Sequence, residues 1–147
     1  MSETKQSDSA PTSAQGSLDV SDVSTVSATA LPQMHEWLWL PDVAELLGVR
    51  GRDVRAMIND HRLVALRRGE NNALAINGGQ FVEKDGEVVP LPPLRGTLIQ
   101  LADAGYTPEE SLRWLMEYHD DLGMTPLEGL RGEKTHAVRR AIQFLAF

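Results

Sequence analysis

Residues 40–59, LPDVAELLGVRGRDVRAMIN, place apolar residues at helical spacing on both sides of a single glycine. Pro41 and Asp42 suit the first turn of a helix, because proline lacks the amide hydrogen left unsatisfied there and a carboxylate is stabilised by the positive end of the helix dipole. Gly48 predicts the end of this helix, since glycine tolerates a left-handed backbone. A second helix is expected over about residues 52–61, so the stretch predicts a helix-turn-helix.

A helix-turn-helix needs small and apolar residues at set positions, and this stretch supplies them. Ala44 allows the second helix to cross the first closely, and Val49 fills the turn. Val54 and Met57 face back onto the first helix. The buried stripe of that first helix is predicted to be Val43, Ala44, Leu46 and Leu47. The residues left facing outward are Arg50, Arg52, Arg55, Ala56 and Asn59.

The positive charge of the chain is concentrated next to this motif. The 147 residues carry a formal net charge of −7, yet residues 50–68 hold six arginines and two aspartates. A local patch outweighs the total because salt screens charges beyond about 8–10 Å. Two interpretations stay open: the arginines solvate the outer face of a small helix, or they face a polyanion. In the second, Arg52 and Arg55 are candidates for base-edge contact in a major groove, and Asn59 for an adenine edge or a phosphate.

Two hairpins are predicted after the second helix. Residues 63–76, LVALRRGENNALAI, indicate two short strands around a turn at 69–72. This arrangement is winged, and its tip can reach phosphates or a flanking minor groove; the open alternative is a solvated hairpin. The residues assigned to phosphate and wing contacts are Arg50, Arg62, Arg67 and Arg68. Residues 82–89, VEKDGEVV, predict the second hairpin, because Asp85-Gly86 suits a type I′ turn.

From Leu94 onward the apolar spacing is helical again. TPEE at 107–110 and TPLE at 125–128 each predict a capping box, in which a threonine hydroxyl and a glutamate carboxylate accept hydrogen bonds from each other's backbone amides. The helix after the first box is expected to bury Leu112, Leu115 and Met116. A last helix is expected over about residues 134–145. The residues predicted to lie in the core or between subdomains include Trp37, Trp39 and Trp114.

Residues 1–34 are rich in serine, threonine, alanine, glutamine and proline and hold no aromatic residue. Such a segment buries too little apolar surface to offset its ordering entropy, so it is expected to be disordered. Its hydroxyls are open to a kinase, and an inert linker is the alternative. The predicted domains are a tail at 1–34, a winged helix-turn-helix at 35–92 and a helical subdomain at 93–147. The expected fold class is mainly α with a small β-hairpin wing.

Neither composition nor motifs indicate an enzyme, a metal site or a membrane protein. No apolar stretch approaches the roughly 18 residues of a spanning helix, and the first residues lack a signal-peptide pattern. The chain has no cysteine, which excludes disulfides and thiolate metal sites, and a cytoplasmic location is the default expectation. GEKT at 132–135 lacks the spacing of a phosphate loop, and HDD at 119–121 has no accompanying metal ligands. No cofactor is expected.

Four motifs distributed from about residue 38 to the end of the chain are LPDVAELLGV, GGQFV, DAGYTPEESLRWL and HAVRRAIQFLAF. On these, the sequence resembles a family of small actinobacterial winged helix-turn-helix DNA-binding proteins, whose best-known member is a substrate of serine/threonine protein kinase L. The resemblance implies binding to double-stranded DNA that is lowered by phosphorylation of a tail threonine. The tail does not align with that of the family, so the candidate sites are Thr4, Thr12, Thr25 and Thr29. The end of the chain, MTPLEGLRGEKTHAVRRAI, is also similar to a family of bacterial antitoxin-associated domains.

The expected function is therefore that of a DNA-binding transcriptional regulator with a cytoplasmic, nucleoid-associated location. Its expected partners are DNA and a Ser/Thr kinase. Phosphorylation adds a charge of about −1.5 to −2, so an acidic tail would compete with DNA for the arginines. The alternative is an adaptor or antitoxin-like partner that binds protein through the same fold. A monomer is expected, since the sequence shows no heptad seam.

Overall fold

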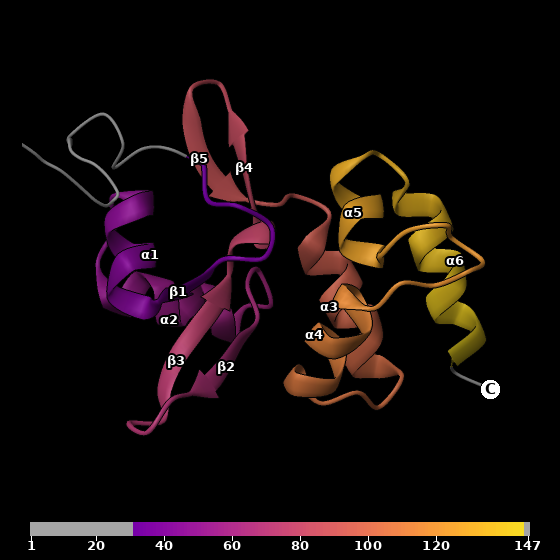
Figure 1. The fold of residues 1–147 in the computed structure, drawn as a ribbon, viewed down its shortest axis with the longest axis horizontal. Coiled ribbons are helices and arrows are strands. Elements are labelled where there is room, and N and C mark those ends of the chain that lie inside the picture. Colours follow the sequence, from indigo (N-terminus) through magenta and orange to yellow (C-terminus); the bar gives the residue numbers. More distant parts are fainter. Residues whose placement is uncertain (1–30, 146–147) are drawn as a thin grey trace, which may run out of the picture. The chain divides into compact units, whose positions relative to one another are not determined.

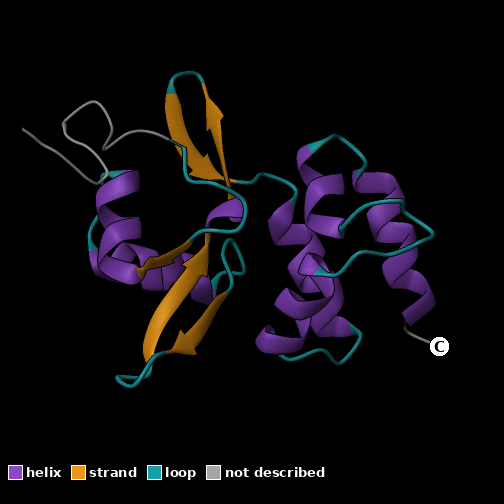
Figure 2. Cartoon of the chain, viewed as in Figure 1, coloured by secondary structure: helices purple, strands orange, loops and turns teal. Residues whose placement is uncertain are grey.

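The structure, a computed structural model, describes residues 31–145 (Figure 1). In chain order the elements are β1 (Trp37–Trp39), α1 (Leu40–Leu47), α2 (Gly51–Asn59), β2 (Ala65–Arg68), β3 (Ala73–Asn77), the 3₁₀ helix η3 (Gly78–Gln80), β4 (Phe81–Lys84), β5 (Glu87–Pro90), α3 (Leu94–Asp103), α4 (Pro108–Met116), α5 (Pro126–Arg131) and α6 (Thr135–Leu145). Helices predominate in this part of the chain, and the strands form two small antiparallel sheets (Figure 2). The predicted fold class, mainly α with a winged helix-turn-helix, is confirmed.

The predicted helix-turn-helix is formed by α1 and α2. The backbone of Gly48 is left-handed, with φ of 70°, and its amide donates to carbonyl oxygens of α1. Val43 and Val54, one from each helix, are fully buried and pack in the same core. α2 ends at Asn59, two residues before the expected end, because His61 has a left-handed backbone with φ of 65° that cannot continue a helix.

A strand that the sequence analysis does not predict, β1, completes a three-stranded sheet. β3 lies in the middle and pairs antiparallel with β1 on one side and β2 on the other. The register places Ala75 of β3 opposite both Trp39 and Leu66, so these three residues share one face. Leu66 packs against the core of the C-terminal helices, whereas Ile76, on the other face, packs with α1 and α2. The sheet therefore belongs to both cores.

The second predicted hairpin, formed by β4 and β5, is confirmed. Its turn has positive φ at both central residues, 55° at Asp85 and 81° at Gly86, as a type I′ turn requires. At the other end of the hairpin, Phe81 lies opposite Pro90. Phe81 is fully buried in the helix-turn-helix core, so its side chain anchors the base of this hairpin.

Helices α3 to α6 enclose a core rich in leucine. Both capping boxes are confirmed: the amide of Glu110 donates to the Thr107 hydroxyl at 3.1 Å, and an equivalent bond opens α5. Leu112 and Leu115 are buried as predicted, but Met116 is 38% exposed, since it is the last residue of α4 and its side chain remains outside the core. No helix within the described residues is long and apolar enough to cross a bilayer.

The prediction for the tryptophans is confirmed in two cases and wrong in one. Trp114 is buried in the core of the C-terminal helices, and Trp37 is half-buried against the same core. Trp39 is 44% exposed. It lies on the same sheet face as Trp37, but its indole extends towards Gly69 at the end of the β2–β3 hairpin, where the described helices do not cover it.

Residues 78–81, GGQF, connect the sheet to the C-terminal helices. A Cβ atom on Gly78 would collide with backbone oxygens before β1, and one on Gly79 would lie 2.7 Å from a leucine side chain of α5. Gln80 is fully buried: its Nε2 donates to the carbonyl oxygen of Val64 at 2.9 Å, and its Oε1 accepts from the Val64 amide at 2.8 Å. Glycine is thus required by close approach, and the glutamine side chain pairs with backbone as a neighbouring strand would.

Candidate nucleic-acid interface

The outer face of α2 presents a row of polar and basic side chains, which we call the α2 row: Arg52, Arg55 and Asn59. All three are exposed, and their spacing of three and then four residues places them on one helix face. On the opposite face, Val54 is fully buried against α1. Because the buried face fixes the rotation of the helix, it also fixes the direction of the α2 row. Among the described residues, no ion pair involves Arg52 or Arg55.

Arg50 occupies the N-cap position of α2. Its backbone amide donates to the Asp53 carboxylate at 3.0 Å, while its own side chain is exposed. The positive end of the helix dipole stabilises this carboxylate. Asp53 also places one negative charge beside the α2 row, which lowers the positive potential at this end of the helix.

The β2–β3 hairpin carries Arg67 and Arg68 beside its tip, and as consecutive strand residues they point to opposite faces. Nη1 of Arg67 donates to the carbonyl oxygen of Asn72 at 2.9 Å, across the turn. The guanidinium carbon of Arg68 lies 4.2 Å from the centroid of the Trp37 ring, a cation–π contact. Both arginines are therefore held along the hairpin and remain exposed.

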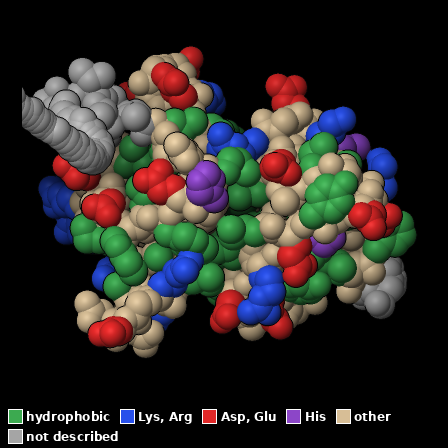
Figure 3. All heavy atoms as spheres, in the orientation of Figure 1, with side chains coloured by type: hydrophobic (Ala, Val, Ile, Leu, Met, Phe, Trp, Pro, Cys, Tyr) green, Lys and Arg blue, Asp and Glu red, His purple; other side chains and the backbone are tan. Residues whose placement is uncertain are grey.

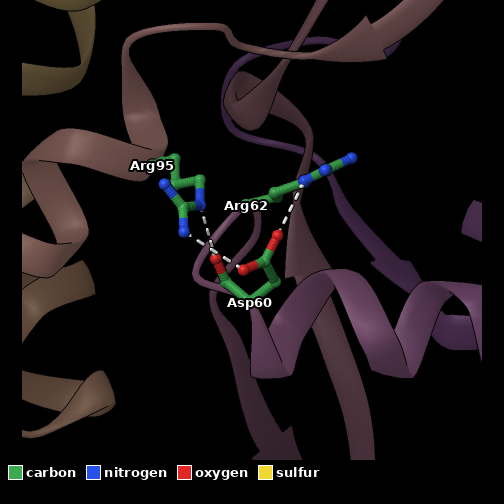
Figure 4. A network of polar contacts seen from close by, with 3 residues as sticks. All are labelled: Asp60, Arg62 and Arg95. Atoms are coloured by element: carbon green, nitrogen blue, oxygen red, sulfur yellow. Dashed lines mark hydrogen bonds and ion pairs between the residues drawn. The ribbon is translucent and has the colours of Figure 1, made fainter.

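Arg62 is engaged by Asp60 just beyond the C-terminal end of α2 (Figure 4). Nε of Arg62 lies 3.0 Å from one carboxylate oxygen, and Nη2 of Arg95, from α3, lies 3.3 Å from the other. Nε of Arg95 also donates to the Asp60 carbonyl at 3.1 Å. The hydrogen bond from Arg95, followed by the Arg62 guanidinium, holds the pKa of the Asp60 carboxyl below its ordinary value.

The residues predicted to contact nucleic acid thus occupy three places. On α2 lie Arg50, Arg52, Arg55 and Asn59. Beside the hairpin tip lie Arg67 and Arg68, and Arg62 is paired with Asp60. On the face drawn in Figure 3, acidic and basic side chains are intermingled. The candidate phosphorylation sites Thr4, Thr12, Thr25 and Thr29 lie outside the described residues.

Two interactions in this region are not predicted from the sequence. Arg95 has no local signal, because its partner Asp60 lies 35 residues earlier in the chain. The stacking of Arg68 on Trp37 depends on β1, the strand that was not predicted. A signal for β1 does exist: Trp-Leu-Trp at 37–39, immediately before α1, is a short run that includes residues favouring strands.

Comparisons with known proteins agree with this architecture. Residues 25–74 match the family model described as "DNA-binding protein Rv2175c, wHTH domain", and residues 91–146 match "Rv2175c C-terminal domain of unknown function". The DNA-binding protein Rv2175c of Mycobacterium tuberculosis (strain ATCC 25618 / H37Rv) is 32% identical over 120 residues, which cover 74% of this chain and 79% of that protein. The NMR structure of Rv2175c is similar with a TM-score of 0.66 and 29% sequence identity, covering 80% of this chain and 85% of that one.

Two helices joined at Gly48, a hairpin after the second helix and an exposed α2 row define a winged helix-turn-helix protein. The match extends through the C-terminal helices, for which a second model of the same family is found. The chain belongs to the Rv2175c family. The resemblance to an actinobacterial winged helix-turn-helix family is thereby confirmed.

Proposed function

We propose that this chain binds double-stranded DNA, with α2 in the major groove and the β2–β3 hairpin against the flanking backbone. The α2 row carries the proposal, because three suitable side chains share one exposed helix face. Arginine pairs bidentately with guanine, and asparagine with adenine, through the base edges exposed in that groove. The description of the relative as a DNA-binding protein supports the same function.

The other predicted residues serve as phosphate contacts in this proposal. Arg50 at the N-cap of α2 and Arg67 and Arg68 beside the hairpin tip are exposed. Arg62 joins them when a phosphate replaces the Asp60 carboxylate as its partner. Each phosphate neutralised contributes about −0.9 to the slope of log K, the association constant, against the logarithm of the salt concentration. Few such contacts on an anionic chain lead us to expect modest affinity and clear salt dependence.

We further propose that the protein is a transcriptional regulator and a kinase substrate, acting as a cytoplasmic, nucleoid-associated monomer. Phosphorylation would add a charge of about −1.5 to −2 to a tail that already carries an excess of acidic residues. Such a tail competes with DNA for the α2 arginines. The candidate acceptors are Thr4, Thr12, Thr25 and Thr29.

Charge reversal in the α2 row tests the DNA proposal. Binding of the full chain to random and to selected duplexes is titrated at about 50 mM and about 200 mM salt. Arg52→Glu with Arg55→Glu is expected to weaken binding to a selected duplex by about 100-fold or more, since each lost base contact costs about 1–3 kcal/mol and repulsion is added. The matched control, Lys134→Glu with Arg140→Glu, reverses two exposed charges near and in α6 and should bind like the parent.

The competing function, a protein-binding adaptor, makes the opposite prediction. Retention of duplex binding by the α2 double variant, together with insensitivity to salt, would contradict the DNA proposal. Failure of the parent to bind any duplex would do the same.

Phosphorylation is tested on the full chain with all four candidate threonines changed to alanine. Treatment with a Ser/Thr kinase should lower the DNA affinity of the parent and leave that of the variant unchanged. An equal loss of affinity in both proteins would show that the relevant group is not one of the four threonines.

A further inference from the structure

A cavity of about 190 Å³ is lined by the C-terminal end of α2 and the loop after it, the β2–β3 hairpin, α3 and α4. Its lining includes the buried residues Leu63, Val64 and Leu98 and the exposed residues Ala102 and Pro108. A mostly apolar hollow at the junction of two subdomains is a common setting for small-molecule sites.

We propose that this cavity is a binding site for a small, neutral, mostly apolar molecule: a single aromatic ring with one hydrogen-bonding substituent. The lining contains none of the residues proposed to contact DNA, and the test of this site needs no DNA. Failure of this proposal and failure of the DNA proposal are therefore measured separately.

The volume sets the size of the occupant. An apolar cavity of about 150 Å³ accommodates a benzene molecule, so about 190 Å³ leaves room for one substituent. The ring of Tyr106, half-buried in the lining, offers an edge or a face to an aromatic guest. A larger ligand, such as a nucleotide, would exceed the space.

Ser111 supplies the polar anchor. This residue lines the cavity and is only 3% exposed, and its hydroxyl can both donate and accept a hydrogen bond. A ligand hydroxyl or amine placed against Ser111 would gain one hydrogen bond in a mostly apolar lining.

The lining also determines the charge of the ligand. His61, at the loop after α2, is the one ionisable side chain besides the Tyr106 phenol among the lining residues, and neither arginine nor lysine is present. A carboxylate buried here would lack a cationic partner and would lose its hydration. We therefore expect phenol to bind and benzoate to be rejected.

A ligand in this cavity would contact both the winged helix-turn-helix and the C-terminal helices. Ile58 belongs to α2, and Ala65 and Leu74 belong to the strands of the β2–β3 hairpin, while Leu98 and Ser111 belong to α3 and α4. Bound ligand would add packing contacts between these elements and raise the free energy of unfolding with the logarithm of the ligand concentration once that exceeds Kd.

The full chain, labelled with ¹⁵N, is titrated with phenol, toluene and benzoate while its amide spectrum is recorded. Phenol and toluene should shift the amides of Ala65, Leu98 and Ser111 with millimolar or tighter affinity, and benzoate should bind at least tenfold more weakly. Ala102→Phe places a large ring in the cavity lining and should weaken phenol binding at least tenfold. The control Gln143→Phe, at an exposed position of α6 outside the lining, should bind phenol like the parent.

Ser111→Ala separates the polar anchor from the cavity itself. It should weaken phenol about fivefold, the value of one hydrogen bond, and leave toluene unchanged. The different effects of Ser111→Ala on phenol and on toluene affinity test the proposal even if Ala102→Phe disturbs folding. The proposal is overturned if neither phenol nor toluene shifts the amides around the cavity, or if Ser111→Ala weakens both ligands equally.

Discussion

At the scale of single residues, Gln80 shows how one buried polar side chain organises the chain around it. Burying an amide without partners is costly, yet both polar ends of this amide are paired with the backbone of Val64. The two bonds satisfy an N–H and a C=O just before β2. The two residues before Gln80, Gly78 and Gly79, allow close approach to the segment before β1 and to α5. The GGQF segment is therefore a structural junction and carries no role in the proposed contacts with DNA.

Replacing Gln80 by leucine should destabilise the protein by about 2–5 kcal/mol, because the amide and the carbonyl of Val64 both lose their partners in a buried place. The measurement is the free energy of unfolding in urea. Gln143→Leu, an exposed position on α6, is the matched control and should change stability by less than about 0.5 kcal/mol. If Gln80→Leu lowered the free energy of unfolding no more than Gln143→Leu does, water would have replaced the two hydrogen bonds to Val64.

Asp60 predicts a specific pH dependence. Its pKa in the folded chain is lowered from the ordinary value of 3.8, first by the hydrogen bond from Arg95 and then by Arg62. The stability that this carboxylate contributes is therefore present above the ordinary pKa and is lost as the pH falls through the lowered one. Asp60→Asn should unfold more easily than the parent at pH 7, and the difference should shrink in strong acid.

The midpoint of urea unfolding, measured between neutral and strongly acid pH, checks this expectation. Asp121→Asn, an exposed aspartate without an ion pair among the described residues, is the control and should show no such convergence. A constant difference between Asp60→Asn and the parent at every pH would show that the carboxylate acts through its shape and not its charge.

At the scale of elements, the ends of the helices are determined by residues within about four positions of one another. Gly48 ends α1, and threonine–glutamate boxes open α4 and α5. These short signals matter for the proposed function, since the turn at Gly48 sets the angle at which α2 leaves α1. The direction of the α2 row follows from that angle.

Gly48→Ala should destabilise the protein by about 1 kcal/mol, because a Cβ atom strains a backbone with φ of 70°. A Cβ at this position meets no atom within 4 Å, so the effect is that of the backbone alone. Gly48→Asn is the control and should cost less, since asparagine tolerates the left-handed region. Urea unfolding measures both variants; equal costs for the two would argue against backbone strain.

At the scale of the described chain as a whole, the three-stranded sheet and a guanidinium join the two cores. One sheet face packs with α1 and α2 and the other with the C-terminal helices. Arg131 of α5 donates to the carbonyl oxygens of Gly79, at 3.1 Å, and of Phe81. We expect residues 31–145 to unfold as one cooperative unit. The division into domains at residues 92 and 93 stays a prediction about organisation along the chain.

Arg131→Met should lower the free energy of unfolding by about 2 kcal/mol, since two carbonyl oxygens lose a charged donor. Unfolding in urea is followed by tryptophan fluorescence and by far-ultraviolet circular dichroism. If the fluorescence and circular dichroism curves coincide within the parent, and likewise within the variant, the described residues unfold as a single unit. The control Arg140→Met, at an exposed position of α6, should leave the free energy of unfolding nearly unchanged. Two separate unfolding transitions in the parent would contradict the shared core.

The residues that the sequence predicts well are those whose environment is local. The Asp85-Gly86 turn and both threonine caps are confirmed, because each depends on neighbours in the chain. The errors concern burial: Met116 and Trp39 are apolar residues in regular elements, yet both are exposed. Whether an apolar side chain is covered depends on which distant segment packs over it, and spacing along the chain does not contain that information.

The sequence by itself determined the helix-turn-helix and the outward direction of the α2 row, since helical periodicity assigns every residue to a face once the buried face is known. Only the tertiary structure decided the rest of the candidate site. It recruits β1 to the sheet, stacks Arg68 on Trp37, and places Arg95 beside Asp60 across 35 residues. These contacts join segments that are distant in the chain, so they exist only after the chain has packed.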